Sequence, residues 1–388
     1  MSELYKVKLV AIAKDEAAYL PEWIFHHLYF GFDAIDIYVN NTTDNTYDLA
    51  DELSGFKNVS FLNGDPYFYG EGHPQQKIYV EAFEKAKKSG FSHIIFLDID
   101  EFWTAHNMTS SIKECISEIG ANIISFEWIN KFEDSEFSFA IDKKIIGEHH
   151  RLVKSLTDLS LEYEKLDIHN VTSKASSNVL ANGEKAIFSK GNQQLASIGD
   201  VKPYFIVHRM YRSQMEYVSL LGRGRPNAKC TFKDNRNGFC YLEYKLEEIN
   251  VLDCGYEVYE LRRKEFLNEC ISFDLNEKSK KFILDRYEDV LKRIESATID
   301  DFDVLRKILR NLKSRRVNDA FSLYLSNICS YLAHDVTDAV RDAAMSFEKK
   351  NIHKAMKLMK IAHCFRPKGI MISEKVKKYE LEIEKKGC

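Results

Sequence analysis

The sequence predicts an α/β fold, with a mostly parallel sheet flanked by helices, followed by an all-α C-terminal domain. In the first third of the chain, short apolar runs alternate with amphipathic segments, which is typical of parallel strands joined by right-handed helical crossovers. One apolar run, at residues 94–97, ends in a cluster of three carboxylates. From about residue 275 onward, charged faces alternate with Leu and Ile stripes at helical spacing.

The elements of the first third follow from hydrophobic patterning and from the positions of Gly and Pro. Short, continuous apolar runs predict buried strands. Pro21 favours the start of the first helix, and Gly31 favours its end. The predicted strands are residues 7–13, 34–39, 59–62, 94–97 and 123–128, and the predicted helices are residues 16–30, 47–53 and 75–89.

The middle of the chain, roughly residues 130–240, is less regular. Strand-like pieces at residues 137–140, 186–188 and 204–207 lie between polar loops that are rich in Gly and Asn. Loops of this kind often carry a functional site on a rigid scaffold.

The helical tail contains a weak internal repeat. Residues 316–323 align with residues 351–358, and Cys329 aligns with Cys364. The two copies begin 35 residues apart. A repeat of this length, with alanines in the helices and Pro367 at the end, resembles a tetratricopeptide-like helical hairpin. Two copies are fewer than a solenoid normally needs, so an ordinary helical bundle remains an equal alternative.

Composition excludes several classes of protein. The net charge of −4 and the pI of about 6.3 argue against a general nucleic-acid binder. Residues 1–8 are polar and the apolar run at residues 9–13 is short, which predicts no secretory signal peptide, and no run is long enough for a membrane span. The eight cysteines form no Cys-x-x-Cys pair, which favours reduced thiols in a cytoplasmic protein.

The carboxylate cluster at the end of the fourth strand predicts a cation site. Asp98 and Asp100 point to the same side of an extended chain, where they repel each other unless a cation lies between them. Oxygen ligands of this kind suit Mg²⁺ or Mn²⁺ that carries a phosphate. The alternative is an acidic turn in which Asp100 or Glu101 caps a helix.

Four polar segments follow the ends of predicted strands in a characteristic order. They are residues 11–23, 40–46, 97–102 and 208–213. The acidic strand end followed by Phe102, the run from Tyr19 to Trp23 and the late His-x-x-x-x-Ser resemble the nucleotide-sugar glycosyltransferases of the GT-A fold, close to families 2 and 92. The resemblance covers roughly residues 6–230.

This resemblance implies a Rossmann-like GT-A domain over residues 1–240. Outside the resemblance, the sequence pattern predicts a connecting segment at 241–272 and a helical domain at 273–388. It implies an enzyme that moves a sugar from a UDP-sugar to a saccharide or lipid-linked saccharide acceptor in surface polysaccharide synthesis, with inversion. A metal-dependent nucleotidyltransferase or phosphohydrolase is an alternative, although the first strand lacks the Gly-rich phosphate loop usual in such enzymes. A degenerate transferase that acts as a scaffold is the non-enzyme alternative.

The resemblance also assigns roles to individual residues. Asp100 would bind Mn²⁺ or Mg²⁺, Asp98 would support the ribose or a metal-bound water, and His208 would complete the metal shell. The alternative for His208 is a partly buried side chain that bonds a loop carbonyl. The uridine pocket of the family maps onto Ala13, Asp15, Glu16, Asn41 and Asp44.

Further donor contacts are predicted from basic and polar residues. Arg223 and Arg225 lie between glycines, which predicts a mobile loop that folds over the diphosphate; Arg212 precedes this loop. Gln76, near a predicted helix N-terminus, is a further candidate. The alternative for the arginines is a solvated run of charge, and Asp44 is an equally good N-cap for the next helix.

An inverting transfer needs a carboxylate that takes the proton of the acceptor hydroxyl. The candidates are Glu127, Glu133 and Asp134, which follow the metal motif near Trp128, a residue able to stack on a sugar ring. The chain lacks the adjacent Glu-Asp pair that many family 2 enzymes carry here, for which Glu133-Asp134 is a candidate substitute. Surface charge is the alternative for each of these acids.

The sequence of the helical domain predicts binding partners for this domain. Apolar stripes that stay exposed would serve self-association into a homo-oligomer or docking onto an acceptor-bearing complex. Basic residues such as Lys313 and Arg316 leave peripheral association with the inner face of the membrane as a second interpretation, because acidic residues are interspersed among them.

Overall fold

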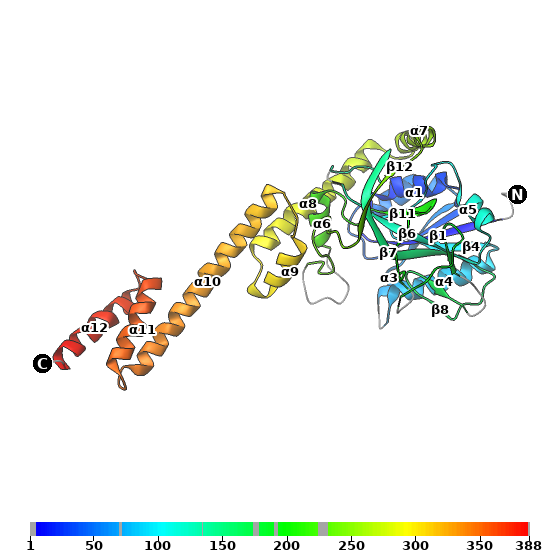
Figure 1. Cartoon of the computed structure of the whole chain (residues 1–388). Helices are drawn as coiled ribbons and strands as arrows, with labels where there is room; N and C mark the ends of the chain where they lie inside the picture. The colour runs from blue at the N-terminus through cyan, green and yellow to red at the C-terminus, as the bar shows by residue number, and fades with distance from the viewer. Residues whose placement is uncertain are drawn as a thin grey trace. The chain divides into compact units, whose positions relative to one another are not determined.

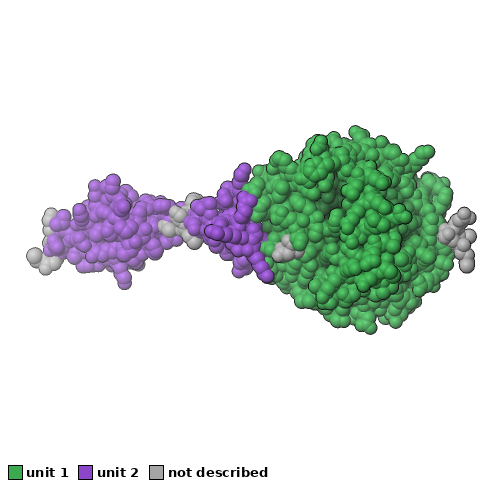
Figure 2. Space-filling view, turned by 90° about the horizontal axis from the view of Figure 1, so that it is seen from above, with its two compact units in different colours: residues 1–290, 308–311 green, residues 291–307, 312–388 purple. Residues whose placement is uncertain are grey.

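The computed structural model describes residues 5–69, 72–133, 135–173, 178–189, 193–223 and 232–386. The chain forms two compact units, which Figure 2 shows in different colours. Unit 1 comprises residues 1–290 and 308–311, and unit 2 comprises residues 291–307 and 312–388. Unit 1 is a sheet with flanking helices and unit 2 is helical, which confirms the predicted fold class (Figure 1).

One large sheet forms the centre of unit 1. Its strands are β1 (Val7–Ala13), β2 (Ala34–Val39), β3 (Val59–Asn63), β4 (His93–Phe96), β5 (Glu101–Ala105), β6 (Ile123–Lys131), β7 (Lys144–Asp158), β10 (Asn178–Leu180), β11 (Tyr204–His208) and β12 (Lys245–Asn250). The order is β3-β2-β1-β4-β7-β6-β11-β5, with β10 beside β6 and β12 beside β7. The strands β3, β2, β1 and β4 are all parallel, as predicted, whereas β7 runs antiparallel to β4 and β6. A separate ribbon pairs β8 (Lys165–Leu166) with β9 (Val171–Thr172).

The path of the chain decides which helices cover which face. The helices of unit 1 are α1 (Leu20–Tyr29), α2 (Thr46–Glu52), α3 (Asp65–Phe68), α4 (Pro74–Lys88), α5 (Ile112–Ile119), α6 (Gln214–Leu221), α7 (Asp253–Cys270) and most of α8 (Phe273–Glu295). The chain goes from β1 to β2 to β3 in one direction and then returns to the other side of β1 for β4. Since such crossovers are right-handed, α1 and α2 lie on one face and α4 on the other. The direction in which successive strands are added to the sheet reverses between β1 and β4. Ligands of open α/β sheets bind at the strand ends beside such a point.

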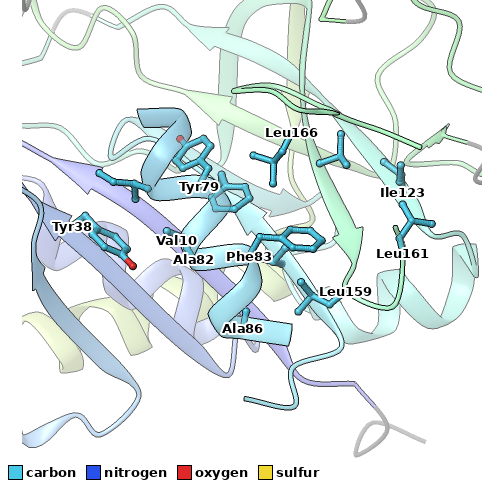
Figure 3. Close-up of a cluster of buried hydrophobic side chains, with 14 residues drawn as sticks. Val10, Tyr38, Tyr79, Ala82, Phe83, Ala86, Ile123, Leu159, Leu161 and Leu166 are labelled. Atoms are coloured by element: carbon cyan, nitrogen blue, oxygen red, sulfur yellow. The ribbon is translucent and has the colours of Figure 1, made fainter. Parts of the chain in front are cut away.

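Helix α4 packs its apolar side against the sheet (Figure 3). Tyr79 stacks on Phe96 of β4 with the ring centroids 4.1 Å apart. Phe83, Val10 of β1 and Tyr38 of β2 belong to the same buried cluster. This cluster anchors the strands whose carboxyl ends carry the candidate site.

Helix α1 holds the turn that follows β4. The indole Nε1 of Trp23 donates to the carbonyl oxygens of Asp98 and Glu101 at 3.1 and 2.9 Å. The helix begins at Leu20 and not at Glu16 as predicted. The reason is local, because Asp15 has a left-handed φ of 52° and the chain makes a turn before the first helical residue.

The long strand β7 was not predicted, although it lies in the centre of the sheet. Gly147 interrupts its apolar pattern, and His149, His150 and Arg151 interrupt it again. A side chain at Gly147 would place its Cβ 2.6 Å from the carbonyl oxygen of Asn130, so the glycine is required by close strand packing. Residues 137–140 form no strand, and of residues 186–188 only Phe188 forms an isolated bridge.

Two buried histidines of α1 predict that acid destabilises unit 1. Burial lowers the pKa of His27 to about 3 and the pKa of His26 well below its ordinary value. Below about pH 6.5 the unfolded chain binds protons that the folded chain does not, so stability falls as the pH falls toward the folded-state pKa. Each histidine contributes a loss of about 1.4 kcal/mol per pH unit in this window.

Urea melts followed by tryptophan fluorescence measure this effect in unit 1, because all three tryptophans lie there. His27→Gln should make the dependence of unfolding free energy on pH shallower between pH 6 and 4. His353→Gln, at an exposed position in unit 2, is the control and should change nothing. An unchanged slope in His27→Gln would show that this histidine is protonated in the folded state.

Unit 2 contains α9 (Phe302–Ile308, which ends in unit 1), α10 (Arg315–Phe347), α11 (Ile352–Phe365) and α12 (Ile370–Lys386). Ala355, Met359 and Tyr379 belong to its buried core. Helix α10 is continuous through the first copy of the internal repeat, so that copy lies in one long helix and the second begins α11. In the part of the chain that the structure describes, no helix combines the length and apolar character that a membrane crossing needs.

Candidate functional site

A pocket of about 510 Å³ lies beside the point where the strand order reverses. Ile12 of β1, the turn after β4, side chains of β6, β7 and β11, and the segment around residues 233–243 line it. The volume is typical of a site for a small organic ligand. Its polar lining contains both carboxylates and cations, so the partners of each charged group decide what the pocket can bind.

Asp100 and His208 face each other in this pocket. The Asp100 Oδ2 atom lies 3.6 Å from His208 Nε2, and the backbone N–H of Arg209 donates to the Asp100 carbonyl at 2.7 Å. Burial would raise the pKa of Asp100, but His208, Arg212 and Arg236 outweigh this effect and hold it well below its usual range. Asp100 is therefore an ionised carboxylate inside a group of positive charges.

The tautomer of His208 follows from its neighbours. Its Nδ1 atom lies 2.9 Å from the side-chain oxygen of Asn130, so Nδ1 carries the proton and donates. In the neutral ring Nε2 then presents its lone pair to Asp100, whereas the protonated ring, which lowers the pKa of Asp100, presents a second N–H there. The ring of Trp128 packs against the histidine, with centroids 4.3 Å apart, and fixes its plane.

Asp100 and His208 are the two described residues of the pocket that could hold a divalent cation. A separation of 3.6 Å exceeds a hydrogen bond, and adjacent ligands of a cation with bonds of about 2.1 Å lie about 3 Å apart. Among the described residues, no group of three or more His, Cys, Asp or Glu side chains is arranged to hold a metal ion. Asp100 and His208 would therefore hold Mg²⁺ or Mn²⁺ together with oxygens of a substrate, which is usual for Mg²⁺.

The structure gives Asp98 a different partner. Asp98 to Glu101 form a turn and not an extended strand, although Asp98 and Asp100 both line the pocket. The Lys154 ammonium lies 3.1 Å from Asp98 Oδ2 and 3.3 Å from Glu101 Oε2. Burial by itself would lower the pKa of Lys154, but the two carboxylates outweigh this effect, and the pKa is raised. The cation that relieves repulsion at Asp98 is thus a lysine of the protein.

Two further cations line the pocket without a carboxylate partner. Neither Lys233 nor Arg236 forms an ion pair with a described residue, and Arg236 Nε has no hydrogen-bond partner among them. Burial and the neighbouring charges of Arg236 and Arg223 lower the pKa of Lys233, and burial lowers that of Arg236, because these effects outweigh the opposing attraction of Asp100. Such crowding is costly without an anion, so this wall of the pocket is suited to bind one.

Some of the predicted donor residues line this pocket and others do not. Glu16 lines it, but its carboxylate is held by Arg212 at 3.0 Å and by Arg223. Arg212 is buried and lies over the ring of Tyr19, outside the pocket lining. Gln76 donates to the carbonyl of Leu166.

The remaining predicted uridine contacts serve the loops themselves. Ala13 is fully buried, and Asn41 is exposed with its N–H bonded to Asp65. Asp15 accepts hydrogen bonds from Thr43. Asp44 accepts from Ala17 and Thr46, and the N-cap of α2 is Asn45, so Asp44 clamps the loop beside the cap.

Of the candidate bases from the sequence, Glu127 and Glu133 do not line the pocket. Side chains alternate along β6, so Trp128 and Asn130 line the pocket while Glu127 lies on the other side, 3.2 Å from His149. Glu133 receives two hydrogen bonds from Arg209 and an ion pair from Lys131.

Burial raises the pKa of Glu133, but Arg209 and Lys131 outweigh this effect and lower it, which makes Glu133 a weak base. Asp134 and Arg225 lie outside the described residues.

Several site residues were missed by the sequence analysis. Lys233 and Arg236 lie in a polar segment without periodicity, and its high density of charge and Asn was the available signal. Glu148 lies on the strand that was not predicted. Glu243 also lines the pocket, and its carboxylate has no hydrogen bond or ion pair with any described residue.

No family model matches the chain, and no curated protein matches it. Similar solved structures include TarS of S. aureus, with 15% identity and a TM-score of 0.22 over 33% of this chain and 22% of that chain. HddC from Yersinia pseudotuberculosis has 11% identity and a TM-score of 0.28 over 53% of this chain and 93% of that chain.

A cytidylyltransferase from Leptospira borgpetersenii serovar Hardjo-bovis (strain JB197) has 13% identity and a TM-score of 0.22. The match covers 40% of this chain and 61% of that chain. The match thus spans about a fifth of the TarS chain. Similarities at these TM-scores carry no functional inference for this chain.

Proposed function

We propose that this chain is a metal-dependent glycosyltransferase that transfers a sugar from a UDP-sugar to a saccharide or lipid-linked saccharide. One observation supports the proposal: the Asp100–His208 pair shares a pocket at the switch point of the sheet with Lys233 and Arg236, which form no ion pair with a described residue. A ligand with two phosphates and a divalent cation would satisfy both sets of charges. A bound cation offsets the charge that develops on the diphosphate as the sugar–phosphate bond breaks.

Glu243 is the acid best suited to act as the base in this proposal. Of the carboxylates that line the pocket, Glu16, Asp98, Asp100 and Glu148 are each engaged by protein groups. Glu243 has no such partner among the described residues. Its carboxylate would accept the proton of the acceptor hydroxyl while the oxygen bonds to the sugar carbon and the electron pair of the broken bond goes to the diphosphate.

UDP should raise the melting temperature of unit 1 when Mn²⁺ is present. A ligand at 100 times its dissociation constant stabilises the folded state by about 2.7 kcal/mol. Lys233→Gln and Arg236→Gln should each weaken UDP binding about 10-fold or more, because each removes a charge-assisted hydrogen bond to phosphate. Lys85→Gln, which changes an exposed lysine of α4, is the matched control.

The products distinguish this function from its alternatives. With a panel of UDP-sugars and Mn²⁺, a glycosyltransferase releases UDP, whereas a phosphohydrolase that splits the phosphoanhydride with water releases UMP and sugar 1-phosphate. A nucleotidyltransferase forms UTP and sugar 1-phosphate, and only when pyrophosphate is added. Absence of Mn²⁺-dependent UDP binding would favour the scaffold interpretation. Equal UDP affinity in the Lys233→Gln and Arg236→Gln variants would contradict the proposed diphosphate wall.

A further inference from the structure

We propose that Glu148 is a positioning residue that sets the tautomer of His208 through Asn130 and so prepares Nε2 to bind the cation. The inference rests on the proposed metal-dependent function. Glu148 lies on β7 directly opposite Asn130 on β6, and both side chains are about 2% exposed. Neither residue belongs to the segments on which the resemblance to known transferases was based.

The direction of the hydrogen bonds is decided at Glu148. One carboxylate oxygen, Oε2, lies 3.0 Å from the side-chain nitrogen of Asn130, and the other, Oε1, accepts the backbone N–H groups of Glu243 and Tyr244. A carboxylate that accepts from all three groups cannot also donate. The amide nitrogen of Asn130 must therefore face Glu148, and its oxygen must face His208.

This orientation reaches the metal pair. The Asn130 oxygen accepts from His208 Nδ1 at 2.9 Å, so in the neutral ring the lone pair is on Nε2, which lies 3.6 Å from Asp100. A neutral imidazole that donates from one nitrogen and presents the other is the form that binds metal ions. If Asn130 turned over, Nδ1 would have to accept, the proton would move to Nε2, and His208 would no longer be a ligand.

The same carboxylate also holds one wall of the pocket. Its second oxygen ties the backbone at Glu243 and Tyr244 to β7, just before β12 pairs with that strand. The side chain of Glu243 lines the pocket that contains His208. Glu148 therefore joins the metal ligand to the segment that carries the proposed base.

Glu148, Asn130 and His208 form a chain of hydrogen bonds, called the relay below. The decisive experiment reverses the direction of the hydrogen bond between residue 148 and Asn130. In Glu148→Gln, the new NH₂ group must face either Asn130 or the two backbone N–H groups. If it faces Asn130, the asparagine must turn over. Mn²⁺ affinity, measured by electron paramagnetic resonance on the full chain, should fall about 10- to 100-fold, the usual effect of losing an outer-shell partner.

The double variant Glu148→Gln with Asn130→Asp should restore Mn²⁺ affinity to within a few-fold of the wild type. The Gln oxygen can accept the two backbone N–H groups, its NH₂ can donate to the new carboxylate, and that carboxylate can accept from His208 Nδ1. If Glu148 had only a structural role, the second substitution would not be expected to restore Mn²⁺ affinity. Glu248→Gln, at an exposed carboxylate of β12, is the matched control and should bind Mn²⁺ like the wild type.

A second measurement reads the tautomer in the chain with Glu148 and Asn130 intact. Nitrogen NMR of the histidine-labelled full chain without metal, at a pH where the ring is neutral and with the His208 signal assigned by its loss in His208→Gln, should show the proton on Nδ1. A neutral ring with its proton on Nε2 would overturn the inference even if Glu148→Gln failed to fold.

The remaining outcomes are distinct. A wild type that binds no Mn²⁺ would overturn the proposed metal dependence and this inference with it. A wild type that binds Mn²⁺ while Glu148→Gln binds it equally well, or a double variant no better than the folded single variant, would overturn the relay alone.

Discussion

Asp100→Asn is expected to weaken Mn²⁺ binding at least about 100-fold and to abolish sugar transfer, because it removes one of two protein ligands of the proposed cation. EDTA should abolish turnover of the wild type, and Mn²⁺ or Mg²⁺ should restore it. The variant should still melt cooperatively, at a lower midpoint, since the cations around Asp100 stabilise its carboxylate in the folded state. Titration of Mn²⁺ against the fluorescence of Trp128, which packs on His208, gives the affinity directly.

Asp48→Asn is the matched control for this experiment. Asp48 is an exposed carboxylate of α2 that pairs with Lys278 at the surface, so its replacement should leave Mn²⁺ affinity unchanged. Full activity of the wild type in EDTA would contradict the metal assignment. Full activity of Asp100→Asn in Mn²⁺ would show that a cation, if needed, is held elsewhere.

Lys154→Met should lower the free energy of unfolding of unit 1 by about 3–5 kcal/mol, the usual cost of removing one partner from a buried ion pair. The Lys154 and Glu101 side chains are 1% and 0% exposed, and Glu101 Oε1 already has no hydrogen-bond partner among the described residues. Loss of the ammonium leaves that carboxylate without a counter-charge in the interior. Urea melts followed by tryptophan fluorescence measure the change in unit 1.

The same strand offers a matched control. Lys144 of β7 pairs with Glu248 at 2.7 Å, but both side chains are about half exposed. Lys144→Met should therefore change the stability by no more than about 1 kcal/mol. Similar effects of the two substitutions would show that Lys154 is solvated in solution and that the turn after β4 does not depend on it.

Local pattern was sufficient for much of the fold. The apolar runs of β1 and β2 were predicted with their observed bounds, because a buried parallel strand has to be apolar along its length. The parallel arrangement of the first four strands also followed from the alternation of strands and helices. The strand β7 could not be predicted, since its polar residues belong to a pocket and an ion pair that only its neighbours in the sheet create.

The candidate site divides in the same way. The sequence by itself placed Asp100 and His208 in one prediction, because an acidic strand end and a late histidine are recognisable as motifs, and the structure brings them to 3.6 Å.

What each carboxylate does was decided only by tertiary structure. Asp98 and Asp100 are two positions apart, yet one is paired with a buried lysine of β7 and the other faces a histidine of β11. Glu148, Lys233 and Arg236 have no motif at all. Their roles arise from distant residues that share one pocket, and the charge balance of a pocket depends on which groups meet there and not on their order in the chain.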